Sequence, residues 1–308
     1  MKALVTGGAG FIGSNIVKKL LDHGWEVRVV DNLSSGYACN LAPFAEDFRE
    51  GDVRDAAFTA QACEGMDVVF HLAASVGRQK SLDHPQTDAE TNVLGAVNVL
   101  EGMRAHGVPK IVYSSSAAIF GELLTPTIDE DHPQNADSPY GVSKLAAEKM
   151  ILAYSGIYGL RSVCLRYFNI YGVNQRYDLY GNVIPIFAQR IHDGKPIGIY
   201  GDGSQTRDFV NVHDVAEANY LAATSEKTGV FNLGSGSSIT IKRLAEMMQQ
   251  IAGRQVGIQY LPKRPADVMH CKANTEKVHR ELGFTANVTL EDGLKEYLEW
   301  FDSKDEQA

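Results

Sequence analysis

The chain has 308 residues, a length that fits one large unit or two interlocked lobes. Apolar residues make up 44% and charged residues 22%, which excludes a disordered, collagen-like or coiled-coil chain. The 29 basic and 38 acidic residues give a net charge of −9, so nucleic acid and anionic membranes are poor partners. The four cysteines form no C-x-x-C pair, and we find no signal peptide and no apolar run of about 18 residues. We therefore expect a soluble, cytoplasmic protein.

The first half of the chain alternates short apolar segments with helical patterns. Strands are expected at residues 3–6, 26–30, 67–71, 110–114 and 161–166. Helices are expected at residues 11–23, 89–106 and 139–158. Strands that alternate with helices of this length predict βαβ units around a buried parallel sheet.

This rhythm loosens after residue 169. Helices are expected there at residues 183–192, 212–224, 240–252 and 290–301, and strands at 230–233 and 256–261. Stretches rich in glycine and proline occur where an α/β fold places its ligand loops, at residues 32–43, 121–138, 171–182 and 201–206.

A glycine-rich segment, GGAGFIG at residues 7–13, joins the first predicted strand to the first predicted helix. Glycine allows a tight turn and a close approach of the backbone to a pyrophosphate, which the helix N-terminus then binds. Asp31 ends the second strand 18 residues after Gly13, a spacing at which a carboxylate holds a ribose 2′-hydroxyl and repels a 2′-phosphate. The pattern predicts NAD rather than NADP, and the alternative is a glycine-rich turn with no ligand.

A second acid, Asp52, ends the predicted third strand. It either meets the adenine edge of the cofactor or caps the helix that follows, and the sequence leaves both hypotheses open.

Tyr140 and Lys144 lie four residues apart, so they share one helix face. A free tyrosine has a pKa near ~10, but a nearby ammonium and the positive ring of NAD⁺ favour the phenolate and make tyrosine a usable general base. Ser116 follows a strand, at the sheet edge where α/β proteins bind ligands, and its hydroxyl is placed to hydrogen-bond the reacting oxygen. The alternative is an amphipathic helix with a solvated lysine.

With these motifs together, the sequence resembles an extended short-chain dehydrogenase/reductase of the NAD-dependent sugar epimerase/dehydratase group. The marks are TGGAGFIGS (residues 6–14), DNLSSG (31–36), HLAA (71–74), SSS (114–116), YGVSK (140–144), LRYFN (165–169), RDFV (207–210) and HD (213–214). The resemblance implies a Rossmann-like, doubly wound parallel sheet with a smaller C-terminal α/β lobe. It implies an NAD-binding domain at residues 1–168, to which part of 206–228 returns, and a nucleotide-sugar-binding domain at 169–308.

Within the family, 4,6-dehydratases carry an Asp-Glu pair at the positions of Ala117 and Ala118, and UDP-glucuronate decarboxylases carry a glutamate at the second one. Without these acids, the segment is most similar to that of the UDP-galactose (UDP-glucose) 4-epimerases. By this resemblance Tyr140 removes the 4-hydroxyl proton while C4 gives hydride to NAD⁺, and Ser116 steadies the 4-oxygen. The 4-keto sugar then turns over and receives the hydride on its other face, so NAD is expected to stay bound as a prosthetic group.

The resemblance also implies the site residues. The expected catalytic residues are Ser116, Tyr140 and Lys144, and no metal is proposed because His23, His106 and His213 lack ligand spacing. The expected cofactor contacts are Gly7, Gly10, Phe11, Ile12, Gly13, Asp31, Asn32, Ser35, Gly36, Asp52, Val53, Leu72, Ala73, Ala74, Asn92, Ser114, Tyr140, Lys144 and Tyr167. The expected substrate contacts are Ser116, Tyr140, Asn169, Asn182, Val183, Gly198, Tyr200, Arg207, Arg264, Asp267 and Cys271.

Among the substrate contacts, the two asparagines would hold the pyrophosphate, Tyr200 would pack on the uracil, and Asp267 would bind the uridine ribose. Arg207 and Arg264 would pair with phosphate oxygens and supply local positive charge to an acidic protein. For Arg207 the alternative is a surface salt bridge with its neighbour Asp208.

The preferred sugar stays open. Cys271 occupies the position that borders the sugar, where a small residue leaves room for an N-acetyl group, so UDP-GlcNAc is expected besides UDP-glucose; the alternative is a buried packing residue. Arg78 or Lys80 would meet a uronate carboxylate in a UDP-glucuronate 4-epimerase. A reductase that releases its product and a non-catalytic NAD-binding module are further alternatives. The family implies a homodimer, with residues 89–106 and 139–158 as its candidate helices.

Overall fold

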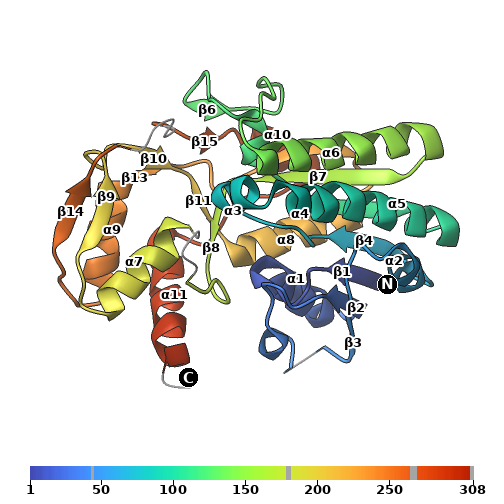
Figure 1. The fold of residues 1–308 in the computed structure, drawn as a ribbon, viewed down its shortest axis with the longest axis horizontal. Helices are drawn as coiled ribbons and strands as arrows, with labels where there is room; N and C mark the ends of the chain where they lie inside the picture. Colours follow the sequence, from blue (N-terminus) through green and yellow to red (C-terminus); the bar gives the residue numbers. More distant parts are fainter. Residues whose placement is uncertain (43–44, 178–181, 264–268, 306–308) are drawn as a thin grey trace.

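The computed structural model describes residues 1–42, 45–177, 182–263 and 269–305. A larger lobe holds a central sheet, and a smaller lobe lies beside it (Figure 1). No helix within the described residues has both the length and the apolar character needed to span a membrane.

The central sheet has seven parallel strands in the order β12-β7-β5-β4-β1-β2-β3. The strands are β1 (Lys2–Thr6), β2 (Glu26–Asp31), β3 (Asp47–Glu50), β4 (Val68–His71), β5 (Lys110–Ser116), β7 (Arg161–Tyr167) and β12 (Gly229–Leu233). Strand β4 is buried at every residue, and β5 and β7 are buried except at one end residue each, as expected of a parallel sheet covered on both faces. The predicted Rossmann-like fold is confirmed.

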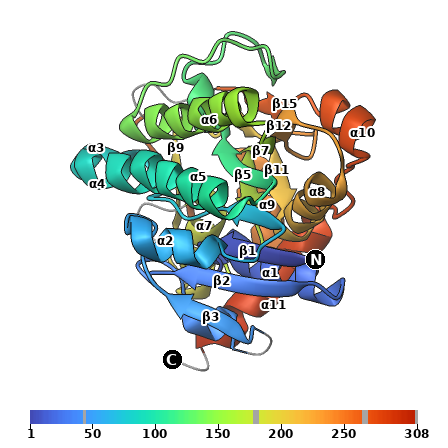
Figure 2. The ribbon, with the colours of Figure 1, turned by 90° about the vertical axis from the view of Figure 1, so that its right-hand side faces the viewer.

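Helices cover both faces of this sheet (Figure 2). One face packs against α1 (Phe11–Asp22), α8 (Val212–Thr224) and α10 (Glu276–Leu282). The other face packs against α2 (Ala56–Cys63), α5 (Gly95–His106) and α6 (Pro139–Tyr158). Both α8 and β12 come from the second half of the chain, so the larger lobe is completed by segments that lie beyond residue 169.

The smaller lobe has its own apolar core. Its main elements are α7 (Val183–His192), α9 (Ile241–Ile251), α11 (Leu290–Asp305), β9 (Ile197–Tyr200) and β14 (Ile258–Leu261). Short strand pairs join the lobes: β8 (Asn169–Tyr171) with β11 (Phe209–Asn211), β10 (Thr206–Arg207) with β13 (Ile239–Thr240), and β6 (Thr127–Ile128) with β15 (Lys272–Ala273).

The helix expected at residues 89–106 begins earlier and is not regular. The short helices α3 (Arg78–Asp83) and α4 (Pro85–Ala89) precede a π-helical turn at Glu90–Leu94, and α5 follows. Such turns occur frequently at functional sites. Here the turn contains the buried Asn92, whose side chain hydrogen-bonds the backbone of Ser75 in the loop after β4.

Candidate functional site

A cavity of about 1230 Å³ opens at the carboxyl edge of the sheet and reaches the smaller lobe. Most of the predicted residues line it: Gly7, Gly10, Phe11, Ile12, Gly13, Asp31, Asn32, Ser35, Val53, Leu72, Ala73, Ala74, Ser114, Ser116, Tyr140, Lys144, Tyr167, Asn169, Asn182, Arg207 and Cys271. Its volume exceeds the ~300–1,000 Å³ of a typical small-molecule pocket, which suits a site for two ligands.

The glycine-rich segment forms a backbone cradle that has no room for side chains. Gly7 has a left-handed φ of 71°, and a Cβ atom on it would lie 2.7 Å from the backbone nitrogen of Ala73. A Cβ atom on Gly13 would lie 2.2 Å from the carbonyl oxygen of Gly7. Gly10 is the N-cap of α1, and no side chain caps that helix, so its first turn is open toward the cavity. The cradle therefore fits an anionic dinucleotide.

Asp31 closes the other side of this cradle at the end of β2. Its carboxylate accepts hydrogen bonds from the backbone N–H groups of Ala9 (3.0 Å) and Leu33 (2.8 Å). Burial raises the pKa of this carboxyl group, while those hydrogen bonds oppose the shift. The carboxylate is thus held in place at the cavity wall, and its contact with a ribose stays a prediction.

Asp52 is not the helix cap that the sequence allowed, because Asp55 is the N-cap of α2 and accepts from the backbone N–H of Phe58 at 3.0 Å. Strand β3 also ends at Glu50, two residues earlier than expected. Asp52 instead accepts hydrogen bonds from Asn32 and Arg54, and the bond from Arg54 holds the pKa of its carboxyl group far below the usual value.

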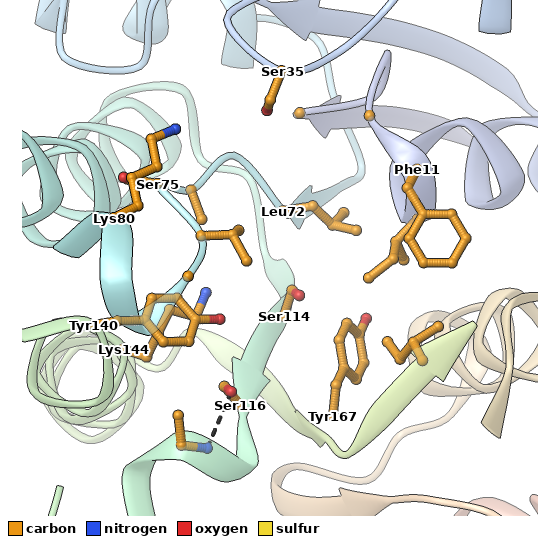
Figure 3. A pocket seen from close by; sticks show the side chains of 18 of the residues that line it. Phe11, Ser35, Leu72, Ser75, Lys80, Ser114, Ser116, Tyr140, Lys144 and Tyr167 are labelled. Carbon is orange, nitrogen blue, oxygen red and sulfur yellow. Dashed lines mark hydrogen bonds between the residues drawn. The ribbon is translucent and has the colours of Figure 1, made fainter. Parts of the chain in front are cut away.

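The predicted catalytic side chains come from two neighbouring elements. Tyr140 and Lys144 project from the first turns of α6, and Ser116 ends β5; Figure 3 shows all three at the cavity. Helix α6 begins where the sequence predicts because Ser138 caps it and Pro139 occupies its first position. The Ser116 hydroxyl accepts a hydrogen bond from the backbone N–H of Ala118 at 3.1 Å, and it lines the cavity together with Tyr140.

Burial governs the protonation of this set in the protein alone. It raises the pKa of the Tyr140 phenol, and the nearby Ser116 hydroxyl only partly offsets this rise. It lowers the pKa of the Lys144 ammonium to about 7, against the opposing charges of Asp88 and Glu148. Burial thus works against the phenolate in the protein alone, and the activation of Tyr140 by the Lys144 ammonium together with the positive ring of NAD⁺ stays a prediction.

The cavity wall between the cradle and the catalytic residues is fixed by hydrogen bonds that it donates to β1. The backbone N–H groups of Leu72 and Ala73 donate to the carbonyl and hydroxyl oxygens of Thr6 at 3.1 Å and 3.3 Å. On the opposite side, Tyr167 hydrogen-bonds Asn219 of α8. Figure 3 shows Leu72, Ser114 and Tyr167 around the space between Phe11 and Ser116.

Among the predicted residues that the structure describes, six do not line this cavity: Gly36, Asp52, Asn92, Val183, Gly198 and Tyr200. Gly36 packs on the cradle, and a Cβ atom there would lie 2.9 Å from the backbone of Ala9. Val183 begins α7, directly after the cavity-lining Asn182. Gly198 and Tyr200 belong to β9, and Tyr200 lines a separate small cavity of about 160 Å³ together with Lys263.

At the substrate end, Asn169 donates a hydrogen bond to the carbonyl oxygen of Asp208 at 3.0 Å. The carboxylate of Asp208 is buried and accepts hydrogen bonds from the backbone of Ser235 and Ala273, so its role is structural. Arg207 donates to the carbonyl oxygen of Thr206 at 2.9 Å and lines the cavity. Arg264 and Asp267 lie outside the described residues.

Cys271 fits both hypotheses made for it. It lines the cavity, and it packs against the small apolar cluster that contains Phe120 and Phe168. Burial raises the pKa of its thiol to about 11, so the side chain is a neutral, small part of the wall.

The cavity also contains side chains that the sequence did not single out. Tyr37 and Arg176 line it from two loops that were expected to bind ligands, but nothing in their spacing pairs them. Arg78 and Lys80, which were named from the sequence as candidate contacts of a uronate carboxylate, also line the cavity, from α3. The guanidinium of Arg78 donates to both carboxylate oxygens of Asp137, at 2.8 Å and 2.7 Å.

Comparison with known proteins agrees with this geometry. Residues 3–234 match the model of the NAD dependent epimerase/dehydratase family. The UDP-glucose 4-epimerase of Corynebacterium glutamicum is 35% identical over 94% of this chain and 92% of its own length. The chain therefore belongs to the NAD-dependent epimerase/dehydratase family, and the predictions of an NAD-dependent enzyme and of NAD as its cofactor are confirmed.

Two solved structures resemble the whole chain. The UDP-glucose 4-epimerase of Thermotoga maritima, crystallised with UDP-glucose, has a TM-score of 0.94 and 38% identity, and 99% of each chain is covered. The UDP-N-acetylglucosamine 4-epimerase of Methanobrevibacter ruminantium M1, in complex with UDP-N-acetylmuramic acid, has a TM-score of 0.94 and 35% identity, and 98% of each chain is covered.

Proposed function

We propose that this protein is a UDP-sugar 4-epimerase that inverts C4 of UDP-glucose and UDP-galactose, and of UDP-GlcNAc and UDP-GalNAc. The observation that carries the proposal is the composition of the reaction site. Ser116, Tyr140 and Lys144 meet at the cavity, while Ala117 and Ala118 line it with methyl groups where an elimination would need acids. This site has the groups for proton transfer at one hydroxyl and lacks those acids.

The cofactor would lie on the glycine cradle, with Asp31 at its ribose and Tyr140 and Lys144 at its reactive end. When bound, NAD would supply a reversible acceptor for the hydride of the sugar C4. The positive charge of its oxidised form would also favour the Tyr140 phenolate. Tyr140 removes the proton from the sugar 4-hydroxyl and returns it after C4 has been inverted. Ser116, which lines the cavity together with Tyr140, would hold the 4-oxygen in reach of the phenol.

The smaller lobe would hold the UDP end. Asn169, Asn182 and Arg207 line the cavity there, and we assign them to the pyrophosphate. Tyr200 lies at the neighbouring small cavity and is assigned to the uracil. This division keeps the larger lobe for NAD and the smaller lobe for the nucleotide sugar.

Incubation with UDP-glucose, UDP-GlcNAc and UDP-glucuronate, each without added NAD, tests the proposal. Conversion of the first two to their galacto epimers, with no net change in bound NAD, is the expected result. Conversion of UDP-glucuronate alone would favour the uronate epimerase, for which Lys80 in the cavity wall is the supporting observation. In a parallel incubation with added NADH, a stoichiometric loss of NADH would show a reductase. Retention of bound NAD without turnover of any sugar would show a binding module.

We also propose a homodimer through α5 and α6. Large apolar side chains are exposed on these helices and the turn before them, including Leu94 (48%), Val142 (54%) and Ile157 (71%). Such exposed apolar groups mark an interaction surface. Analytical ultracentrifugation of wild type and Ile157→Glu is expected to show a dimer and a monomer, and a monomeric wild type would contradict the assignment.

A further inference from the structure

Two loops from distant parts of the chain meet at the wall of the NAD site. Tyr37 lies in the loop after β2, and Arg176 in the loop after β8. The central guanidinium carbon of Arg176 lies 3.8 Å from the ring centre of Tyr37, and its Nη2 lies 3.3 Å from the Sγ atom of Cys39. Both side chains line the cavity that also contains the glycine cradle and Asp31.

The loop with Tyr37 is anchored directly to the cradle. The carbonyl oxygen of Ala9 accepts hydrogen bonds from the backbone of Tyr37 at 3.0 Å and from the side chain of Asn40 at 2.9 Å. Tyr37 itself is 44% exposed, so part of its surface contacts solvent while its ring packs against Arg176.

The loop with Arg176 is anchored to both lobes. Asn174 adopts a left-handed φ of 71°, a conformation that asparagine tolerates better than most residues, and donates to the Ser14 hydroxyl of α1 at 3.0 Å. The next residue, Gln175, offers its carbonyl oxygen to Tyr297 of α11 at 2.9 Å. This loop therefore reaches the cofactor side from a support that also contacts the smaller lobe.

Arg176 has a second property that points to a ligand. Its Nε atom is buried and has no hydrogen-bond partner among the described residues. Buried donors normally find an acceptor. A dinucleotide in the cavity that Arg176 lines brings pyrophosphate oxygens, which are the acceptors that a guanidinium group prefers.

We propose that Tyr37 and Arg176 form the outer wall of the NAD site, and that this stacked pair must separate before the dinucleotide leaves. The pair would slow the release of NAD, and slow release is what keeps NAD bound as a prosthetic group. The inference concerns retention of the cofactor and does not depend on which UDP-sugar is turned over.

The test measures exchange of bound NAD in the holoenzyme. Purified protein is mixed with excess radiolabelled NAD, and incorporation of label is followed after rapid gel filtration. Because the contact is partly exposed to solvent, Tyr37→Leu and Arg176→Met should each speed exchange by roughly three- to fivefold. Tyr37→Phe keeps the ring and should exchange like the wild type, as should the control Arg190→Met, which changes an exposed side chain of α7.

A double variant separates this contact from general loosening. If the two side chains act on each other, Tyr37→Leu/Arg176→Met should exchange no faster than the faster single variant. Exchange rates of both single variants within twofold of the wild type would overturn the proposal, and so would fully additive effects. Because Arg176→Met tests the contact from the second loop, the proposal stays falsifiable even where Tyr37→Leu fails to fold.

Discussion

The ammonium group of Lys144 lies 4.4 Å from the ring centre of Tyr113, and both side chains are buried in the larger lobe. The face of the aromatic ring gives the buried ammonium group a favourable cation–π contact. This contact only partly replaces solvation, because burial still lowers the pKa of Lys144 to about 7. A lysine poised near neutrality is suited to the proton transfers proposed for Tyr140.

The lowered pKa of Lys144 predicts that the stability of the folded protein depends on pH. The pKa of Lys144 is about 7 in the folded protein and 10.5 as its ordinary value, so the unfolded chain binds more protons between these limits. The free energy of unfolding should therefore rise from pH 7 to pH 9, by about 2 kcal/mol from this group. Urea unfolding of cofactor-free wild type and Lys144→Met measures it. An equal rise in both proteins would contradict the assigned pKa.

Removal of the phenol should abolish turnover without loss of the cofactor. In Tyr140→Phe the ring remains, but the group that takes the 4-hydroxyl proton is gone. We expect kcat to fall by a factor of about 10²–10⁴, with bound NAD unchanged. Initial rates and the NAD content of the denatured protein measure the two properties. Wild-type activity in this variant would exclude Tyr140 as the base.

The cradle predicts a sharp difference between two glycines. In Gly13→Ala the new methyl group would lie 2.2 Å from the Gly7 carbonyl oxygen, so the loop must move and NAD binding should be lost. The matched change Gly156→Ala, in the exposed part of α6, meets no atom within 4 Å and should stabilise the helix by about 0.5–1 kcal/mol. Calorimetric titration with NAD distinguishes them, and unchanged affinity in Gly13→Ala would contradict the cradle.

A buried ion pair fixes α6 against the sheet. Arg166 of β7 and Glu148 of α6 are almost fully buried, with 2.7 Å between Nη2 and Oε1, and the Ser115 hydroxyl donates to Glu148 at 2.6 Å. Arg166→Met leaves an unpaired buried charge and should cost about 3–5 kcal/mol of stability. Glu148→Gln/Arg166→Met should recover much of this loss in urea unfolding. A single variant as stable as the wild type would show that the pair is dispensable.

The size of residue 271 should set the range of sugars. Cys271 lines the cavity, so Cys271→Tyr fills space that an N-acetyl group would take. We expect kcat/KM for UDP-GlcNAc to fall by about 10- to 200-fold relative to UDP-glucose. Parallel assays of both sugars measure the ratio. An equal fall for both would favour the packing role of Cys271.

The sequence predicted the parts of the fold that local patterns specify. Helices α6, α7 and α8 begin and end at the predicted residues, since capping residues and apolar spacing mark them clearly. The short strands β6, β8, β10, β11, β13 and β15 were missed, because two or three residues become a strand only when a distant partner lies beside them. The π-helical turn around Asn92 was missed because its hydrogen bonds to Ser75 are tertiary.

The candidate site shows the same limit. Motif residues such as Gly13, Asp31 and Tyr140 line the cavity and could be predicted from the sequence, because each belongs to a motif of a few residues with a fixed spacing. Asn92 was expected at the cofactor, but its amide is buried among Ser75 and Ser143 and supports the wall instead. The contact of Tyr37 with Arg176 has no local signal, since it depends on how two loops meet.

The most direct test of the central claim, that this site removes hydride from C4 and returns it to the same carbon, uses UDP-glucose with deuterium at C4. The labelled sugar is incubated with the protein in ordinary water without added NAD, and the product is analysed by NMR. The account predicts UDP-galactose that retains deuterium at C4. Deuterium lost to the solvent, or transferred to C6 of a 6-deoxy sugar, would contradict it.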